Sequence, residues 1–290
     1  MSNLGGTFTF PGTGLTVHRM GFGAMQLPGK GVWGPPRDHE QALAVVREAV
    51  DSGIDHIDTA DFYGPEIANQ LIREALFPYP RRPVVVSKIG AKRGPDASWR
   101  PATSDDEIVA AIKRNVETLG LAKIDIVNVR LFDPSVPPAE VERMVRAVVS
   151  CVDRGLVGHV GMSNASAGQV RAAQGVAPIV CVQNHYNLIR RADDAMIYDL
   201  AAQGIPYVPF FPLGGFSPIQ SGRLDELARR LDVTPMQLAL AWLLARSPNV
   251  LLIPGTSSLA HLRENIAAAS VEIPEEIARE LNALAGKPVS

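Results

Sequence analysis

Residues 104–127 read SDDEIVAAIKRNVETLGLAKIDIV. Ser104, with Glu107 three positions later, has the capping-box pattern of a helix start, and Gly120 is typical of a helix end. Between them, apolar residues recur every three or four positions, which predicts one buried face. The run 124–127 lacks strict alternation of apolar and polar residues, as expected of a parallel strand buried on both faces. The stretch therefore predicts a helix followed directly by a parallel strand.

The same pairing of a short apolar run with an amphipathic helix repeats along nearly the whole chain. Predicted strands begin near Met20, His56, Val84, Ile124, His159, Ile179, Tyr207 and Val250. Eight such units favour a closed barrel over an open sheet, so the predicted fold class is α/β, a (β/α)8 TIM barrel. Residues 7–10 and 15–17 predict an N-terminal β-hairpin that plugs the barrel, and a C-terminal helix is expected after Pro274. We see no linker, so we expect a single domain over 1–290.

Composition narrows the class of protein further. The chain has 290 residues, of which 46% are hydrophobic and 20% charged, with a net charge of −2. These values fit a globular protein with a large core and argue against nucleic acid or an anionic membrane as a partner. No signal sequence or membrane-spanning run is apparent, and Cys151 and Cys181 are expected to be buried free thiols. We therefore expect a cytoplasmic protein without a metal centre, as a monomer or small homo-oligomer.

Three residues at or just past the ends of predicted strands suggest a catalytic device. Asp58 and Lys88 end consecutive strands, and Tyr63 lies on the loop between them. A free phenol titrates near 10, and a neighbouring ammonium lowers that pKa. Lys88, kept charged by Asp58, would therefore help Tyr63 to protonate a carbonyl oxygen while hydride reaches the carbon. Taken alone, an Asp after a strand is usually a helix cap, and a lone Tyr is usually a packed ring.

A hydride donor would have to be bound without the usual nucleotide motifs. The chain contains neither the dinucleotide fingerprint nor the phosphate-binding loop that glycine-rich sequences provide. Barrels commonly bind phosphate where the loops after strands 7 and 8 meet a helix N-terminus. Those loops are 210–215 and 253–258 here. On pattern alone, each fits a phosphate site and an ordinary turn equally well.

Several short motifs, in order from about Phe8 to Leu284, resemble the aldo-keto reductase superfamily. They are residues 21–25 (GFGAM), 58–60 (DTA), 63–64 (YG), 161–164 (GMSN), 183–184 (QN), 212–214 (PLG) and 253–255 (IPG). The resemblance implies a (β/α)8 barrel that binds NADPH and reversibly reduces an aldehyde or ketone to an alcohol. Four further segments resemble a bacterial branch that reduces pyridoxal to pyridoxine: residues 62–65, 96–99, 191–196 and 208–216. Pyridoxal is therefore the favoured small-molecule carbonyl substrate.

Carried over position by position, the resemblance implies Tyr63 as the proton donor, supported by Lys88 and Asp58. The implied cofactor-binding residues are Gly23, Ala24, Met25, Asp58, Ser163, Asn164, Gln183, Phe210, Phe211, Pro212, Leu213, Gly214, Gly215, Ile253, Gly255, Thr256, Ser257, His261, Glu264 and Asn265. Ser163, Asn164 and Gln183 would contact the nicotinamide carboxamide, and Phe210 would stack on its ring. The residues expected to frame the mouth toward the substrate are Trp33 and Trp99, although either could instead pack its own loop.

Two departures from the family pattern matter. Many members carry a His at the end of the fourth strand, where this chain has Arg130. Arginine stays protonated and cannot shuttle a proton, so we expect it to bind a substrate oxygen or an anionic group, unless it forms a rim ion pair with Asp133. At the 2′-phosphate end, Gly255 and His261 replace two cationic residues, and Arg263 compensates if its side chain points inward. NADPH remains the expected cofactor.

Two other functions are compatible with these residues. A lysine at a barrel strand end can form an imine with a carbonyl substrate, which would make the protein a Schiff-base lyase using Lys88. The third possibility is a non-catalytic partner subunit that senses nicotinamide nucleotides. It predicts tight cofactor binding with negligible turnover.

Overall fold

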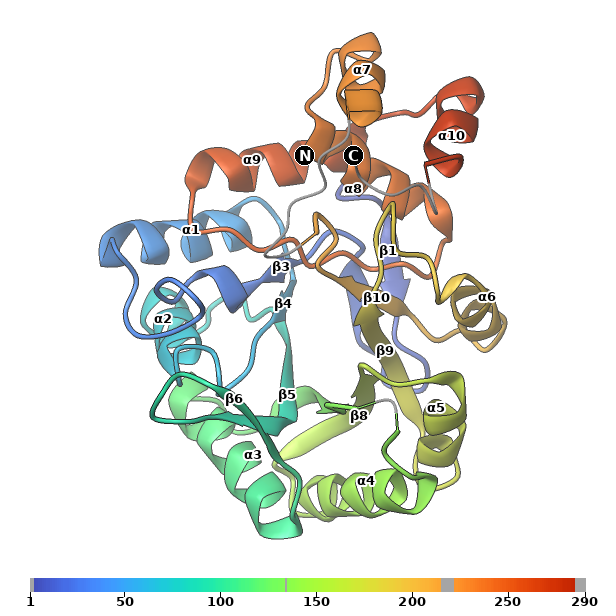
Figure 1. The fold of residues 1–290 in the computed structure, drawn as a ribbon. Helices are drawn as coiled ribbons and strands as arrows, with labels where there is room; N and C mark the ends of the chain where they lie inside the picture. The colour runs from blue at the N-terminus through green and yellow to red at the C-terminus, as the bar shows by residue number, and fades with distance from the viewer. Residues whose placement is uncertain (1–2, 134, 215–221, 285–290) are drawn as a thin grey trace.

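The computed structural model describes residues 3–133, 135–214 and 222–284. Figure 1 shows a ring of strands surrounded by helices. The strands of the ring are β3 (Phe22–Gly23), β4 (His56–Asp58), β5 (Val84–Arg93), β7 (Ile124–Arg130), β8 (Val157–Ser163), β9 (Ile179–His185) and β10 (Tyr207–Phe210). They pair in chain order, and every pair is parallel. This arrangement confirms the predicted α/β class.

The segment predicted as the eighth strand closes the ring. Its Leu252 N–H donates to Arg19 O at 2.7 Å, and its Leu251 N–H donates to Tyr207 O at 3.0 Å. It therefore bonds to the chain just before β3 on one side and to β10 on the other. The pairing takes the form of isolated parallel bridges rather than a continuous ladder. The architecture is the predicted eight-stranded α/β barrel.

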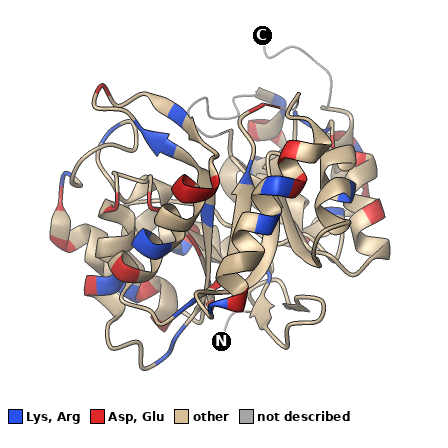
Figure 2. Ribbon diagram, turned by 90° about the horizontal axis from the view of Figure 1, so that it is seen from below, with Lys and Arg blue, Asp and Glu red and all other residues tan. Residues whose placement is uncertain are grey.

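Helices cover the outside of the barrel. They are α1 (His39–Asp51), α2 (Ile67–Leu76), α3 (Asp105–Leu119), α4 (Pro138–Asp153), α5 (Ala167–Gln174), α6 (Asp194–Ala202), α7 (Gly222–Arg230), α8 (Pro235–Arg246), α9 (Leu259–Ala267) and α10 (Glu275–Asn282), with short 3-10 turns η1 (Ala24–Gln26) and η2 (Ala268–Ser270). The capping box expected at Ser104 and Glu107 is present, and Gly120 ends α3 with φ of 64°. Figure 2 shows acidic and basic positions interspersed over the molecule. None of the described helices is both long and apolar enough to span a membrane.

Two apolar layers explain why the strands do not alternate in the sequence. Val85 packs outward in the layer shared with the helices, whereas its neighbour Val86 packs inside the barrel. Successive strand residues point to opposite faces, so both must be apolar when both faces are buried. The hairpin of β1 (Thr7–Thr9) and β2 (Thr16–His18) adds Phe10 and Val17 to the inner layer, both fully buried. The predicted plug is therefore confirmed.

One element beside the barrel mouth was not predicted from the sequence. Strand β5 continues past the ring to Arg93 and pairs antiparallel with β6 (Trp99–Ala102). The guanidinium carbon of Arg93 lies 4.2 Å from the centre of the Trp99 ring, which ties the two strands together. Strand β5 belongs both to the barrel and to the hairpin with β6. No turn therefore separates the two parts, and the sequence pattern predicts one strand followed by a loop.

Candidate active site

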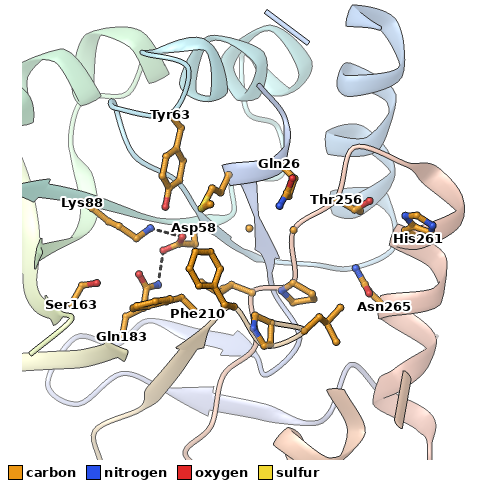
Figure 3. A pocket seen from close by; sticks show the side chains of 18 of the residues that line it. Gln26, Asp58, Tyr63, Lys88, Ser163, Gln183, Phe210, Thr256, His261 and Asn265 are labelled. Carbon is orange, nitrogen blue, oxygen red and sulfur yellow. Dashed lines mark hydrogen bonds and ion pairs between the residues drawn. The ribbon is translucent and has the colours of Figure 1, made fainter. Parts of the chain in front are cut away.

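Asp58, Tyr63 and Lys88 meet at the carboxyl end of the barrel. Asp58 and Lys88 come from the paired strands β4 and β5, and the Lys88 Nζ donates to Asp58 Oδ1 at 2.5 Å. The same Nζ lies 5.2 Å from the centre of the Tyr63 ring. Figure 3 shows the Tyr63 hydroxyl pointing toward Lys88. All three side chains are buried, with exposed fractions of 3%, 6% and 4%.

Burial and charge act in opposite directions on Tyr63. Burial is the largest influence and raises the pKa of the phenol; Lys88 and, more weakly, Arg130 lower it, and the negative charge of Asp58 raises it. The net pKa is raised, which differs from the lowering that the sequence suggested. The physical reason is that a phenolate loses its hydration in this enclosed position. Burial also works against the Lys88 ammonium, but Asp58 and Tyr63 outweigh it and the Lys88 pKa is raised.

The same carboxylate reaches across the barrel to Gln183 on β9. Gln183 Nε2 donates to Asp58 Oδ2 at 2.8 Å. Within the described part of the chain, Gln183 Oε1 is buried and has no hydrogen-bond partner. Close by, Phe210 at the end of β10 stacks on His185 with ring centres 5.4 Å apart. This side of the site therefore offers a free amide oxygen and an aromatic face.

These groups line a cavity of about 530 Å³, within the size range of small-molecule sites. Most of the residues singled out from the sequence line it, namely Gly23, Met25, Asp58, Tyr63, Lys88, Trp99, Arg130, Ser163, Gln183, Phe210, Phe211, Pro212, Leu213, Ile253, Gly255, Thr256, His261, Glu264 and Asn265. In Figure 3, Tyr63 and Lys88 lie at one end, and Thr256, His261 and Asn265 at the other. The cavity thus extends from the mouth of β4 and β5 to helix α9.

Four lining residues were missed by sequence reasoning: Gln26, Phe62, Met236 and Pro254. Phe62 and Pro254 lie inside motifs named above, 62–65 and 253–255, but were not assigned to the site, and Gln26 lies one position beyond the motif 21–25. Met236 lies at the start of α8, and its approach to the cavity depends on helix packing that leaves no local signal.

Five singled-out residues lie outside the cavity lining, namely Ala24, Trp33, Asn164, Gly214 and Ser257. The Asn164 side-chain amide donates to Leu131 O at 2.7 Å, which uses one of its two N–H donors within the protein. Trp33 is half-buried, with the guanidinium carbon of Arg93 5.2 Å from the centre of a Trp33 ring. Gly215, together with the rest of the segment 215–221, lies outside the described residues.

Arg130 ends β7 and lines the cavity. Its guanidinium carbon lies 4.6 Å from the centre of the Phe132 ring, and its Nη1 is buried without a partner among the residues that the structure describes. No ion pair joins it to Asp133 in that part of the chain. Burial lowers the Arg130 pKa and Tyr63 raises it, with a net lowering. Arg130 therefore holds a positive charge and an available donor beside Tyr63.

At the α9 end of the cavity, Arg263 points away from it. Its guanidinium bonds to both carboxylate oxygens of Glu48 on α1, at 2.5 and 3.0 Å. Two other side chains of α9, His261 and Glu264, do line the cavity. Arg263 therefore does not take the place of the two cationic residues that Gly255 and His261 replace.

The fold and the cavity define a (β/α)8 barrel with a ligand site at the carboxyl ends of its strands. Residues 19–218 and 219–285 match the model of the Aldo/keto reductase family. The chain belongs to the aldo/keto reductase family.

Curated relatives and solved structures agree with this assignment. The chain is 54% identical over 281 residues to pyridoxine 4-dehydrogenase of Escherichia coli (strain K12), covering 96% of this chain and 98% of that protein. It is 35% identical to an uncharacterized oxidoreductase of Schizosaccharomyces pombe, over 92% of this chain and 87% of that protein. A thermostable aldo-keto reductase in complex with the inhibitor epalrestat superposes with a TM-score of 0.81 at 27% identity, over 96% and 99% of the two chains. The Klebsiella pneumoniae aldo/keto reductase in complex with NADP and acetate shares the fold, with a TM-score of 0.79 at 22% identity, over 97% and 96%.

Proposed function

We propose that the protein catalyses the reversible NADPH-dependent reduction of an aldehyde or ketone, with pyridoxal to pyridoxine as the favoured reaction. The observation that carries the proposal is the buried contact of Lys88 with Asp58 beneath the Tyr63 ring. The identity to the Escherichia coli pyridoxine 4-dehydrogenase supports the substrate, and the NADP in the Klebsiella pneumoniae enzyme supports the cofactor.

The polar and aromatic groups that line the cavity fit a nicotinamide dinucleotide. Gln183 Oε1 is buried and unpartnered within the described ranges, so it can accept a hydrogen bond from a carboxamide N–H. Phe210 presents a ring to the cavity that can stack on a flat heterocycle. When bound, the dihydronicotinamide supplies hydride. Residues 211–213 would follow the pyrophosphate, and the α9 end with Thr256 and Asn265 would hold the adenosine.

Tyr63 would transfer a proton from its hydroxyl to the carbonyl oxygen of the substrate. Its raised pKa keeps the phenol protonated at neutral pH, ready to donate. The oxygen that receives the proton becomes alkoxide-like as hydride adds, and an alkoxide is far more basic than a phenolate. Lys88 stabilises the phenolate that forms, and Asp58 keeps the ammonium in place.

Arg130 would recognise the substrate beside the reacting carbonyl. Pyridoxal carries a ring hydroxyl next to its aldehyde, and the unpartnered Nη1 of Arg130 can donate to that oxygen. The aromatic rings of Phe62 and Trp99 also line the cavity and pack edge to face, 5.7 Å apart. They offer apolar surface to an aromatic substrate.

The alternative of a Schiff-base lyase requires Lys88 to lose its proton before it attacks a carbonyl. Its raised pKa and the contact with Asp58 oppose that step. Borohydride treatment with substrate separates the two mechanisms, because reduction of an imine would inactivate the protein irreversibly. A non-catalytic nucleotide sensor would instead bind NADPH without consuming it.

The test is NADPH consumption with pyridoxal and a panel of other aldehydes, each repeated with NADH. We expect pyridoxal-dependent turnover with NADPH, and Tyr63→Phe should remove it while leaving NADPH affinity within about twofold. Turnover by Tyr63→Phe at the rate of the unmutated protein would remove the phenol from this role.

A further inference from the structure

Two residues directly beside the ion pair point the opposite way. Thr59 follows Asp58 and Ser87 precedes Lys88, so their side chains leave the strands on the outer face, toward the helices. Both are fully buried, with exposed fractions of 0%. Thr59 and Ser87 are thus polar residues in the otherwise apolar layer between the barrel and the helices.

These two hydroxyls belong to a set of side-chain hydrogen bonds with α2 and α3, which continues from Asn69 Nδ2 to the Thr118 hydroxyl at 3.0 Å. We call its four buried members the outer network, and they are Thr59, Ser87, Asn69 of α2 and Asn115 of α3. The Thr59 hydroxyl donates to Asn69 Oδ1 at 2.7 Å, and Asn69 Nδ2 donates to Asn115 Oδ1 at 3.0 Å. The Ser87 hydroxyl donates to the same Asn115 oxygen at 2.5 Å. Asn115 Nδ2 donates to Ala111 O at 2.9 Å, so both amides are used on both sides.

The outer network acts on Lys88 through the backbone of Thr59. Lys88 Nζ donates to Thr59 O at 3.1 Å, in addition to its bond to Asp58. The Thr59 N–H is held as well, by Val86 O at 2.9 Å. An ammonium has three N–H donors. With two of them directed to Asp58 and Thr59, the third is left for Tyr63.

We propose that the outer network is a positioning device that orients the Lys88 ammonium toward Tyr63 and so sets the efficiency of proton transfer. The inference rests on the proposed role of Tyr63 as proton donor. None of the four members lines the cavity, so the network acts without touching a ligand. Asn69 and Asn115 each use their amide oxygen and their amide nitrogen, so rotation of either amide breaks hydrogen bonds in a buried position and one geometry is favoured.

The test variant is Thr59→Val, which replaces the hydroxyl with a methyl group of similar size and keeps the backbone bond to Lys88. We expect kcat for reduction to fall roughly tenfold, less than the 10²–10⁴ attributed to a whole general acid. In the oxidation direction the phenolate is the base, so the rising limb of its pH profile should move up by about one unit, because a less well placed cation stabilises the phenolate less. The dissociation constant of NADPH should stay within about twofold.

Two companion variants separate positioning from stability. Thr59→Ser keeps the hydroxyl and should restore the pH limb and kcat. Asn249→Leu removes another buried amide, which donates to Ile197 O and Ile205 O far from the cavity, and should lower thermal stability without moving the limb. If Thr59→Val does not fold, Ser87→Ala takes its place, because it removes a single bond of the outer network. It should lower kcat and raise the pH limb in the same direction.

The outcomes distinguish this inference from the proposed function. A folded Thr59→Val with unchanged kcat and pH limb, measured beside an inactive Tyr63→Phe, would overturn the positioning role alone. A fully active Tyr63→Phe would overturn the proposed function and this inference together. A shift in the limb that Thr59→Ser reverses and Asn249→Leu does not reproduce would support the outer network.

Discussion

Gln183 Nε2 donates to Asp58 Oδ2 at 2.8 Å, although the two residues are 125 positions apart in the chain. The other oxygen of this carboxylate accepts from Lys88. One carboxylate therefore connects the residue proposed to hold the nicotinamide with the cation proposed to assist Tyr63. A substitution at Gln183 should therefore affect Lys88, and a substitution at Lys88 should affect Gln183.

Gln183→Met tests this connection. The variant keeps the side-chain length but removes both the donor to Asp58 and the free acceptor. We expect the dissociation constant of NADPH to rise about tenfold, roughly the 1.4 kcal/mol of a hydrogen bond, with a smaller fall in kcat. Fluorescence titration with NADPH measures the first effect. Gln203→Met, at the exposed end of α6, is the control.

Lys88→Met should cost stability as well as activity. It leaves the Asp58 carboxylate buried without its cation, which typically destabilises by about 3–5 kcal/mol. Adding Asp58→Asn removes the unpaired charge and should recover part of that loss without recovering turnover. Urea unfolding of both variants checks the expectation. Equal stability of the single and double variants would contradict the importance of the buried charge.

Arg130→Met should affect substrate selection more than cofactor binding. We expect kcat/KM for pyridoxal to fall by roughly 10- to 100-fold, because a charge-assisted hydrogen bond to the ring oxygen is lost. Benzaldehyde has no such oxygen, so its kcat/KM should fall much less. Arg130→Lys keeps the charge and tests whether the guanidinium shape matters. Equal losses for both aldehydes would argue against recognition of the ring oxygen.

Glu48→Gln should change the choice between NADPH and NADH. Glu48 holds Arg263 by two hydrogen bonds on the α1 side, away from the cavity. Loss of the carboxylate frees the guanidinium to reach an anionic 2′-phosphate. We expect the ratio of the NADH to the NADPH dissociation constant to increase several-fold, as measured by titration of each cofactor. Arg263→Ala combined with Glu48→Gln should abolish the gain.

His56 should make the fold sensitive to acid. Burial lowers its pKa from 6.5 to about 4, and it lies 1% exposed in the barrel interior. The unfolded chain therefore takes up a proton first, so the stabilisation is complete above about pH 6.5 and is lost as the pH falls toward 4. The loss amounts to about 3 kcal/mol by the 1.36 kcal/mol per unit rule.

His56→Leu removes this titration, so its unfolding free energy should fall less between pH 7 and pH 4 than that of the unmutated protein. Chemical unfolding across this range provides the comparison. His261→Gln, on the exposed first turn of α9, should follow the unmutated profile. If the unfolding free energy of His56→Leu falls as much as that of the unmutated protein, the acid sensitivity comes from other residues.

Local signals explain what the sequence could predict. Capping boxes depend on residues three positions apart, as at Ser104 and Glu107, and they appear where expected. A parallel strand that is buried on both faces needs apolar residues at successive positions, and the short apolar segments of the sequence show this pattern. The predicted strand ends located Asp58 and Lys88 at one mouth, because a parallel barrel gathers its strand ends there, although β5 itself continues to Arg93.

The tertiary structure decided everything that depends on packing between distant segments. No local pattern pairs Arg263 with Glu48, and none brings Met236 to the cavity. The direction of the Tyr63 pKa was also beyond the sequence, since it depends on how much water the fold removes from the hydroxyl. The chain itself determined which residue types stand at the strand ends. Only the closed barrel determined their distances and burial, and these set the balance between desolvation and charge.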